Sequence, residues 1–193
     1  MSILGDVFPT RKLSLSKIAA LAAAAPIRIP FRVQRQGRHG QWCWAAVTAS
    51  VSGYPDPPFS NPVTMCKLAS DVLDRRCCDN PTEEGCEVQN SLDGPLARIG
   101  RLREPVINGF LGPAAVATEL RADLPLPIRV AWTRSGNGGH FIAIRGISMI
   151  PGGVQYDVTD PIHGESSVMG AALISGGYLA RGGTWTHSYV VTV

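Results

Sequence analysis

The chain has 193 residues and a mass of 20.6 kDa, close to the usual size of one globular domain. Hydrophobic residues make up 45% and charged residues 17% of the sequence, a balance that excludes a disordered chain. The net charge of +3 is too small to indicate nucleic-acid binding, and no apolar run is long enough to predict a membrane-spanning helix.

The first 30 residues form a basic N-terminal arm. Residues 1–40 carry seven cationic side chains and one acidic side chain, a net charge of +6, whereas residues 41–193 carry −3. An Ala-rich stretch at 18–25 is typical of either a secretory signal or a short helix ended by Pro26. We interpret the arm, residues 1–30, as a pro-segment, a secretion signal or a packed helix, and residues 31–193 as one domain.

Hydrophobic periodicity and breakers predict helices before strands. The helices are expected over 42–52, 63–75, 92–99 and 112–122. The strands are expected over 128–132, 140–147, 154–159 and 185–193, with a hairpin loop over 148–153. Helices followed by antiparallel strands predict an α+β fold.

Five cysteines divide into a group of four and one that stands apart. Since adjacent cysteines usually bond outward to two partners, Cys77 and Cys78 are expected to pair with Cys66 and Cys86, in one order or the other. The spacing lacks the knuckle of a zinc site, so we favour two disulfides and an oxidising compartment, with reduced structural thiols as the alternative. This leaves Cys43 as the odd thiol.

Cys43 falls at the start of the first predicted helix. The unsatisfied N–H groups and the positive end of the helix dipole favour a thiolate there. The alternative is a small buried hydrophobic side chain on an Ala-rich helix. A thiolate nucleophile needs a base, and the base needs a group that orients it.

His140 and Asp160 fit those two roles. Gly138 and Gly139 bring His140 to the start of an apolar strand, where rigidity and access combine. Folding about the predicted hairpin loop places Asp160 opposite His140 to within a residue or two. The alternative for Asp160 is a turn-forming role in its Asp-Pro dipeptide.

The chain order Cys, His, Asp resembles that of the papain-like cysteine peptidases. The sequence is most similar to small bacterial members of that group, which include secreted effectors, over residues 30–193. The matching pieces are the motif Trp42-Cys43-Trp44-Ala45-Ala46, the paired cysteines downstream, Gly138-Gly139-His140-Phe141, Asp160-Pro161 and the strand from Gly183 to Tyr189.

The resemblance implies a papain-like fold and a role for each residue. Cys43 would be the nucleophile, His140 the general base and then acid, and Asp160 the orienting residue. The family's oxyanion-hole glutamine usually lies six residues before the nucleophile, which is Gly37 in this sequence. One extra loop residue makes Gln36 the expected donor, with Gln41 as the alternative.

These residues predict a cysteine peptidase that hydrolyses peptide bonds through a thioester. The alternatives are an acyltransferase or deamidase with the same triad, and a non-catalytic disulfide-stabilised binding module. We expect a protein or peptide substrate, no metal and no cofactor. The cysteines and the resemblance also predict secretion or translocation to an oxidising compartment, after synthesis in a bacterial cytoplasm.

Overall fold

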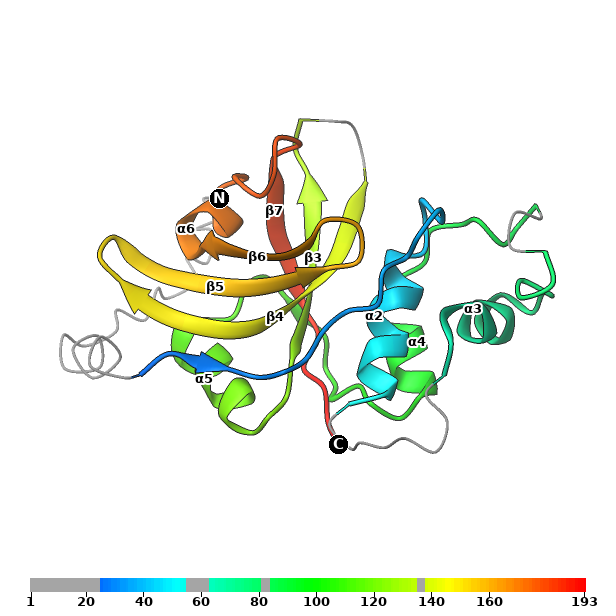
Figure 1. Cartoon of the computed structure of the whole chain (residues 1–193), viewed down its shortest axis with the longest axis horizontal. Coiled ribbons are helices and arrows are strands. Elements are labelled where there is room, and N and C mark those ends of the chain that lie inside the picture. The colour runs from blue at the N-terminus through cyan, green and yellow to red at the C-terminus, as the bar shows by residue number, and fades with distance from the viewer. Residues whose placement is uncertain (1–24, 55–62, 81–83, 135–137) are drawn as a thin grey trace, which may run out of the picture.

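The computed structural model describes residues 25–54, 63–80, 84–134 and 138–193. It has the predicted α+β architecture, with a helical half on one side and a sheet on the other (Figure 1). The helices are α2 (Cys43–Ser52), α3 (Met65–Leu73), α4 (Asp93–Arg98), α5 (Pro113–Arg121) and α6 (Gly170–Ile174).

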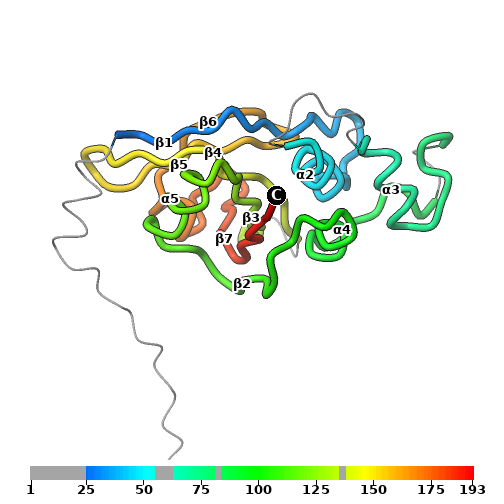
Figure 2. The backbone as a smooth tube through the Cα atoms, turned by 90° about the horizontal axis from the view of Figure 1, so that it is seen from below, coloured from blue at the N-terminus to red at the C-terminus, as the bar shows by residue number. Residues whose placement is uncertain are grey.

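A seven-stranded antiparallel sheet forms the second half of the molecule. Its main path runs in the order β2-β7-β3-β4-β5-β6, and β1 pairs with β4 outside this path. The strands are β1 (Ile27–Arg28), β2 (Ile107–Asn108), β3 (Leu126–Trp132), β4 (Gly139–Ile150), β5 (Gly153–Asp160), β6 (Gly164–Met169) and β7 (Gly183–Ser188). Viewed from below, α2, α3 and α4 gather at one end of the molecule and α5 lies near the other (Figure 2).

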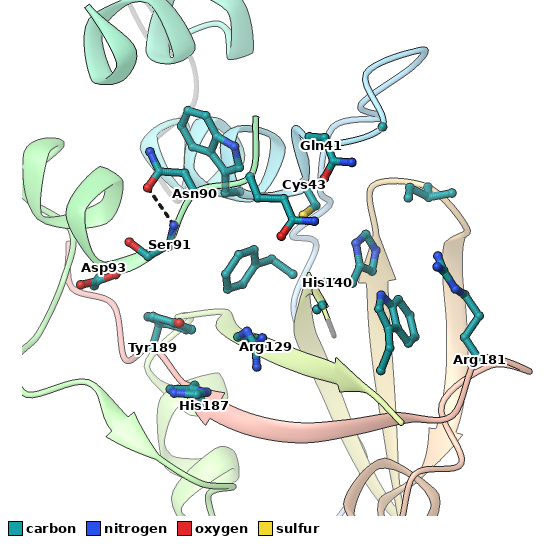
Figure 3. Close-up of a pocket in the computed structure, with 18 of the residues that line it drawn as sticks. Gln41, Cys43, Asn90, Ser91, Asp93, Arg129, His140, Arg181, His187 and Tyr189 are labelled. Atoms are coloured by element: carbon teal, nitrogen blue, oxygen red, sulfur yellow. Dashed lines mark hydrogen bonds between the residues drawn. The ribbon is translucent and has the colours of Figure 1, made fainter. Parts of the chain in front are cut away.

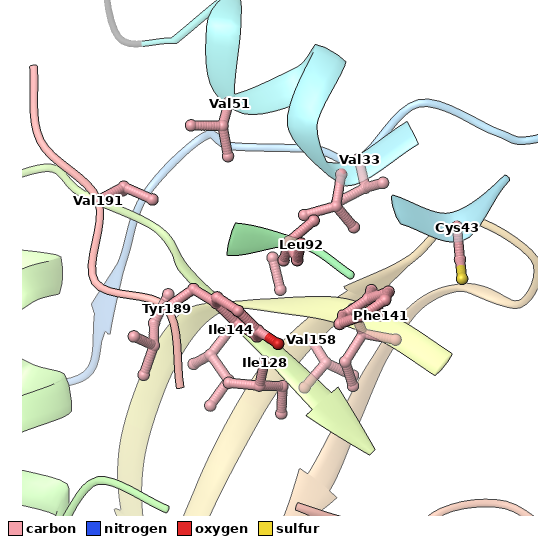
Figure 4. Packing of buried hydrophobic residues seen from close by; sticks show 14 of the residues in the cluster. Val33, Cys43, Val51, Leu92, Ile128, Phe141, Ile144, Val158, Tyr189 and Val191 are labelled. Carbon is pink, nitrogen blue, oxygen red and sulfur yellow. The ribbon is translucent and has the colours of Figure 1, made fainter. Parts of the chain in front are cut away.

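Helix α2 is the centre of the helical half. It is apolar all round, and its residues from Cys43 to Val51 are buried. Three alanines, Ala45, Ala46 and Ala49, are fully buried, and such small side chains let neighbouring backbones approach closely. The helix contacts α3, α4 and β4, so it joins the helical half to the sheet. Figure 4 shows Cys43 at the edge of this core.

The hairpin of β4 and β5 is longer than predicted. Its ladder continues to the pair Ile150 and Gly153, so the connecting turn is shorter than the expected loop over 148–153. Gly152 and Gly153 have φ values of 103° and 128°, which only glycine adopts readily, and they permit the tight reversal. The hairpin carries His140 near the start of one strand and Asp160 at the end of the other.

The described part of the N-terminal arm packs against the sheet. Ile27 pairs with Ile147, and the buried side chains of Ile29, Phe31 and Val33 alternate with exposed neighbours. Arg28 lies 3.5 Å from the Asp157 carboxylate. The expected Ala-rich helix lies outside the described residues, and the domain boundary at residue 30 stays a prediction.

The expected disulfides are formed, and the structure selects one pairing. Cys66 bonds to Cys78, and Cys77 bonds to Cys86. Cys43 is a free thiol. In the part of the chain that the structure describes, no three His, Cys, Asp or Glu residues gather in a way that could hold a metal ion. Over those same residues, no helix has the length and apolar character needed to cross a membrane.

We expect a mild reductant to open the two disulfides in sequence. Cys78 is exposed, whereas Cys77 and Cys86 are both fully buried, so the Cys66–Cys78 bond is the accessible one. Stepwise reduction, alkylation and mass mapping would follow the order of opening. Opening the buried bond should then cost about 2–4 kcal/mol of unfolding free energy. Simultaneous loss of both bonds would contradict this prediction.

Candidate active site

Cys43 is the first residue of α2 and thus lies in the first turn, as predicted, although the helix was expected to begin at Trp42. The tryptophans on either side fix the start of this helix, because Trp42 Nε1 donates to the Cys86 carbonyl at 2.7 Å and Trp44 Nε1 donates to the Val88 carbonyl at 3.1 Å. The buried disulfide includes Cys86, so it braces the same segment. The two indoles therefore hold the position of the thiol that lies between them.

His140 lies opposite Cys43, on the sheet side. Its Nε2 atom lies 2.9 Å from Asp160 Oδ1, and the Cys43 side chain is near enough to the ring to raise the pKa of His140. Since Nε2 is engaged by the carboxylate, the other ring nitrogen, Nδ1, is the one left for the thiol. The structure thus brings together the three residues that were expected to form the triad.

Asp160 is held by donors on both carboxylate oxygens. Besides His140, the backbone N–H groups of Ile162 and His163 donate to Oδ1 at 2.7 and 2.8 Å. The Tyr178 hydroxyl donates to Oδ2 at 2.6 Å. Asp160 therefore does make the turn predicted by its Asp-Pro dipeptide, and it contacts the histidine at the same time.

The two buried partners stabilise each other's charge. Burial alone would disfavour the imidazolium, but the hydrogen bonds to Asp160 and Cys43 outweigh it and raise the pKa of His140 to about 9. Burial likewise opposes ionisation of Asp160, yet His140, Tyr178 and the His163 N–H lower its pKa to about 2. The pair is therefore an imidazolium–carboxylate pair around neutral pH.

This pair is expected to give the folded state a definite pH dependence. The pKa of His140 is raised from 6.5, so its stabilising effect is complete below pH 6.5 and is lost as the pH rises through about 9. The pKa of Asp160 is lowered from 3.8, so its effect is complete above that value and is lost as the pH falls through about 2. Urea unfolding of the wild type and His140→Gln from pH 5 to 10 would measure this. A stability difference that stays constant from pH 6.5 to about 9 would contradict it.

A cleft of about 930 Å³ opens between the helical half and the sheet. Cys43 and His140 both line it, and Figure 3 shows their side chains on opposite walls. Residues that precede α4 form one end of the cleft, and Arg181 lies at the other end. An extended peptide could therefore pass across the thiol.

The two glutamines considered for the oxyanion hole occupy different places. Gln41 lines the cleft beside Cys43. Gln36 is buried, its Nε2 donates to the His39 carbonyl, and its Oε1 has no partner among the described residues. His39 in turn stacks on Trp42 and pairs with Glu87 at 3.1 Å.

Sequence reasoning also missed the side chains of Trp132 and Tyr178, which contact the candidate triad. Trp132 stacks on His140 with ring centroids 5.9 Å apart, and Arg181 lies 5.0 Å above the Trp132 ring. Tyr178 reaches Asp160 from a connection between α6 and β7. Trp132 could have been suspected from its place at the end of a strand. Tyr178 carried no signal, because its segment has no strand or helix pattern.

An α+β fold with a cysteine and a histidine facing each other across a cleft is the architecture of a papain-like cysteine peptidase. Residues 24–173 match the family model described as papain-like cysteine protease AvrRpt2. The match spans most of the chain, which therefore belongs to this family. The chain is a papain-like cysteine peptidase, a hydrolase.

Solved structures give more distant likenesses. Procathepsin L 3 from the larval midgut of Tenebrio molitor aligns with 88% of this chain and 70% of its own, at 10% identity and a TM-score of 0.48. The Pseudomonas avirulence protein AvrPphB aligns with 84% of this chain and 98% of its own, at 16% identity and a TM-score of 0.39. No curated protein matches in sequence. Both TM-scores are low, so the assignment rests on the family match.

Proposed function

We propose that the protein hydrolyses peptide bonds through a Cys43–His140–Asp160 triad and a thioester intermediate. The observation that carries this proposal is the 2.9 Å hydrogen bond between His140 Nε2 and Asp160 Oδ1, made by a ring that lines the same cleft as Cys43. A nucleophile, its base and an orienting group in one chain of hydrogen bonds are what acyl transfer to a thiol requires.

The reaction follows from the charges of these groups. The Cys43 sulfur, as the thiolate beside the His140 imidazolium, attacks the carbonyl carbon, and the Cys43 backbone N–H, which begins α2 and has no acceptor within the helix, faces the developing oxyanion. His140 then gives its proton to the leaving amine, and the C–N bond breaks to leave a thioester. Neutral His140 next removes a proton from water, which attacks the thioester and releases the acid and the Cys43 thiolate, so that the starting pair is restored.

We propose Gln36 as the side-chain donor to the oxyanion, with Gln41 as the alternative. Gln36 Oε1 is buried without a partner among the described residues, and a rearrangement that turns its amide toward the substrate could remove this cost. Gln41 already lines the cleft.

Matched alanine variants distinguish the two glutamines. Gln36→Ala should lower kcat by about 10²-fold, the effect of losing one oxyanion donor, while Gln41→Ala should change it little. Steady-state kinetics on a quenched peptide would measure both variants. The opposite ranking would move the role to Gln41, and no effect of either would leave only backbone donors.

The proposal is tested directly by trapping the nucleophile. An epoxysuccinyl inhibitor should label Cys43, as located by mass mapping, and labelling should be lost in His140→Ala. Iodoacetamide labelling of both unfolded proteins would confirm that the thiol is intact. Failure of the inhibitor to label the folded wild type, or equal labelling of His140→Ala, would overturn the triad.

We also infer passage of the protein through an oxidising compartment, by secretion or translocation. Two disulfides within one segment support this inference, since such bonds persist where thiols are not kept reduced. Membership of the AvrRpt2 family of papain-like cysteine proteases is consistent with an exported effector.

A further inference from the structure

Arg129 is a cationic side chain inside the cleft that the proposed hydrolysis does not use. It lies on β3, with Phe141 as its partner on β4 and His187 as its partner on β7. Cross-strand partners share a face of the sheet, so the three side chains form one row. All three line the cleft, and Figure 3 shows Arg129 between the aromatic side chains of one wall and His140.

Two local features hold the guanidinium close to the proposed base. The ladder between β3 and β7 shifts register directly after Arg129 and leaves Thr186 as an extra residue. Such bulges re-aim neighbouring side chains, and Arg129 Nη1 donates to the Thr186 hydroxyl at 3.1 Å. A Cβ at Gly139 would lie 2.8 Å from Arg129 Nη2, so the guanidinium covers the residue directly before His140.

The positive charge of Arg129 is not matched by an acidic partner. Among the described residues, no carboxylate lies within 4.0 Å of it. Asp93 also lines the cleft, but Tyr189 stands between it and Arg129 in the view of Figure 3. The burial of the Phe141 and Tyr189 rings excludes water from one side of the site. A partly buried guanidinium in such surroundings favours a carboxylate as its ligand.

We infer that Arg129 forms a subsite for a carboxylate of the substrate, namely an Asp or Glu side chain within two residues of the cleaved bond. This inference rests on the proposed hydrolysis, because that reaction defines the cleaved bond from which the position of the Asp or Glu side chain is counted. The guanidinium lies against Gly139 and thus one residue from His140, so the recognised side chain must be near the scissile carbonyl. A terminal carboxylate offers the same chemistry and would make the enzyme trim chain ends instead.

Binding to an inactive enzyme tests the subsite separately from catalysis. We would titrate Cys43→Ala with N-acetylated, C-amidated decapeptides that carry Glu or its neutral match Gln at one position in turn. A charge-assisted pair predicts that the best Glu peptide binds about tenfold or more tightly than its Gln match. A non-amidated Gln peptide reports on a terminal carboxylate. If only that peptide binds more tightly, the recognised carboxylate is the chain terminus and the proposal of an Asp or Glu side chain is rejected.

Variants locate the effect at Arg129. In Cys43→Ala/Arg129→Gln the Glu-to-Gln ratio should fall to about one, whereas Cys43→Ala/Arg181→Gln, which changes the other arginine of the cleft, should keep it. Gly139→Ala should also lower the ratio, because its methyl group displaces the guanidinium. Arg129→Glu should reverse the preference toward Lys peptides. Circular dichroism of each variant confirms that it is folded. The Glu-to-Gln ratio measured with Cys43→Ala alone tests the subsite even where a further variant does not fold.

The outcomes separate the two proposals. Equal binding of Glu and Gln peptides, binding of none, or a preference that survives Arg129→Gln would overturn the subsite. A clear Glu preference with no cleavage of those peptides by the wild type would overturn the proposed hydrolysis and leave the subsite standing. Cleavage of the peptides without a Glu preference would overturn the subsite and leave the proposed hydrolysis standing.

Discussion

Replacement of Cys43 by alanine is expected to lower the rate of peptide hydrolysis by at least ~10⁴-fold. Without the sulfur no thioester can form, and the remaining donors cannot supply a nucleophile. The free energy of unfolding should change by only about 1 kcal/mol, because the substitution removes one atom at the edge of the core. Progress curves on a quenched peptide and urea unfolding would measure the two effects.

A matched control separates chemistry from folding. The double variant Cys66→Ala/Cys78→Ala also removes sulfur atoms, but from the accessible disulfide on the helical half. It should keep most of the hydrolytic activity, since the indoles around Cys43 are braced through Cys86 instead. Substantial hydrolysis by Cys43→Ala would exclude this residue as the nucleophile.

Loss of the Asp160 carboxylate should damage both the site and the fold. Asp160→Ala leaves four donors without an acceptor, namely His140, Tyr178 and the N–H groups of residues 162 and 163. Breaking such a buried pair costs about 3–5 kcal/mol. We also expect kcat/KM to fall by on the order of 10²–10⁴-fold, because burial then opposes protonation of His140.

Two milder variants separate the effect of the Asp160 charge from the effect of a single hydrogen-bond donor. Asp160→Asn keeps an acceptor but removes the charge, so the pH at which kcat/KM declines on the alkaline side should move well below about 9. Tyr178→Phe keeps the charge and removes one donor, which should cost about 1–3 kcal/mol of stability with a smaller kinetic loss. An unchanged pH profile in Asp160→Asn would show that this carboxylate does not control the histidine.

The sequence predicted the elements whose pattern is local. Helix α2 was expected over 42–52 and begins at Cys43, because an unbroken apolar run between two turns leaves few alternatives. The pairing of His140 with Asp160 was also accessible, since both flank one hairpin. These features depend only on residues that are close to each other in the sequence.

The features that were missed depend on distant partners. The two-residue strands β1 and β2 form only because they pair with β4 and β7, respectively. Strand β6 is polar on its exposed side and was overlooked, although it pairs with β5 from Gln155 to Asp160. His187 lies in the strand expected over 185–193, and its pairing with Arg129 brings it to the cleft, which the strand pattern does not indicate. Such placements follow from register, which periodicity alone does not specify.

The proposed nucleophile and its base, Cys43 and His140, lie far apart in the sequence and on opposite halves of the molecule. A nascent or partly unfolded chain therefore holds a thiol without a partner, and the reactive pair exists only once the sheet has closed against α2. The reactivity of Cys43 toward an affinity label would then show, for any variant, whether the sheet has closed against α2. Under the proposed triad, an incompletely folded copy lacks the paired base and is expected not to cleave peptides.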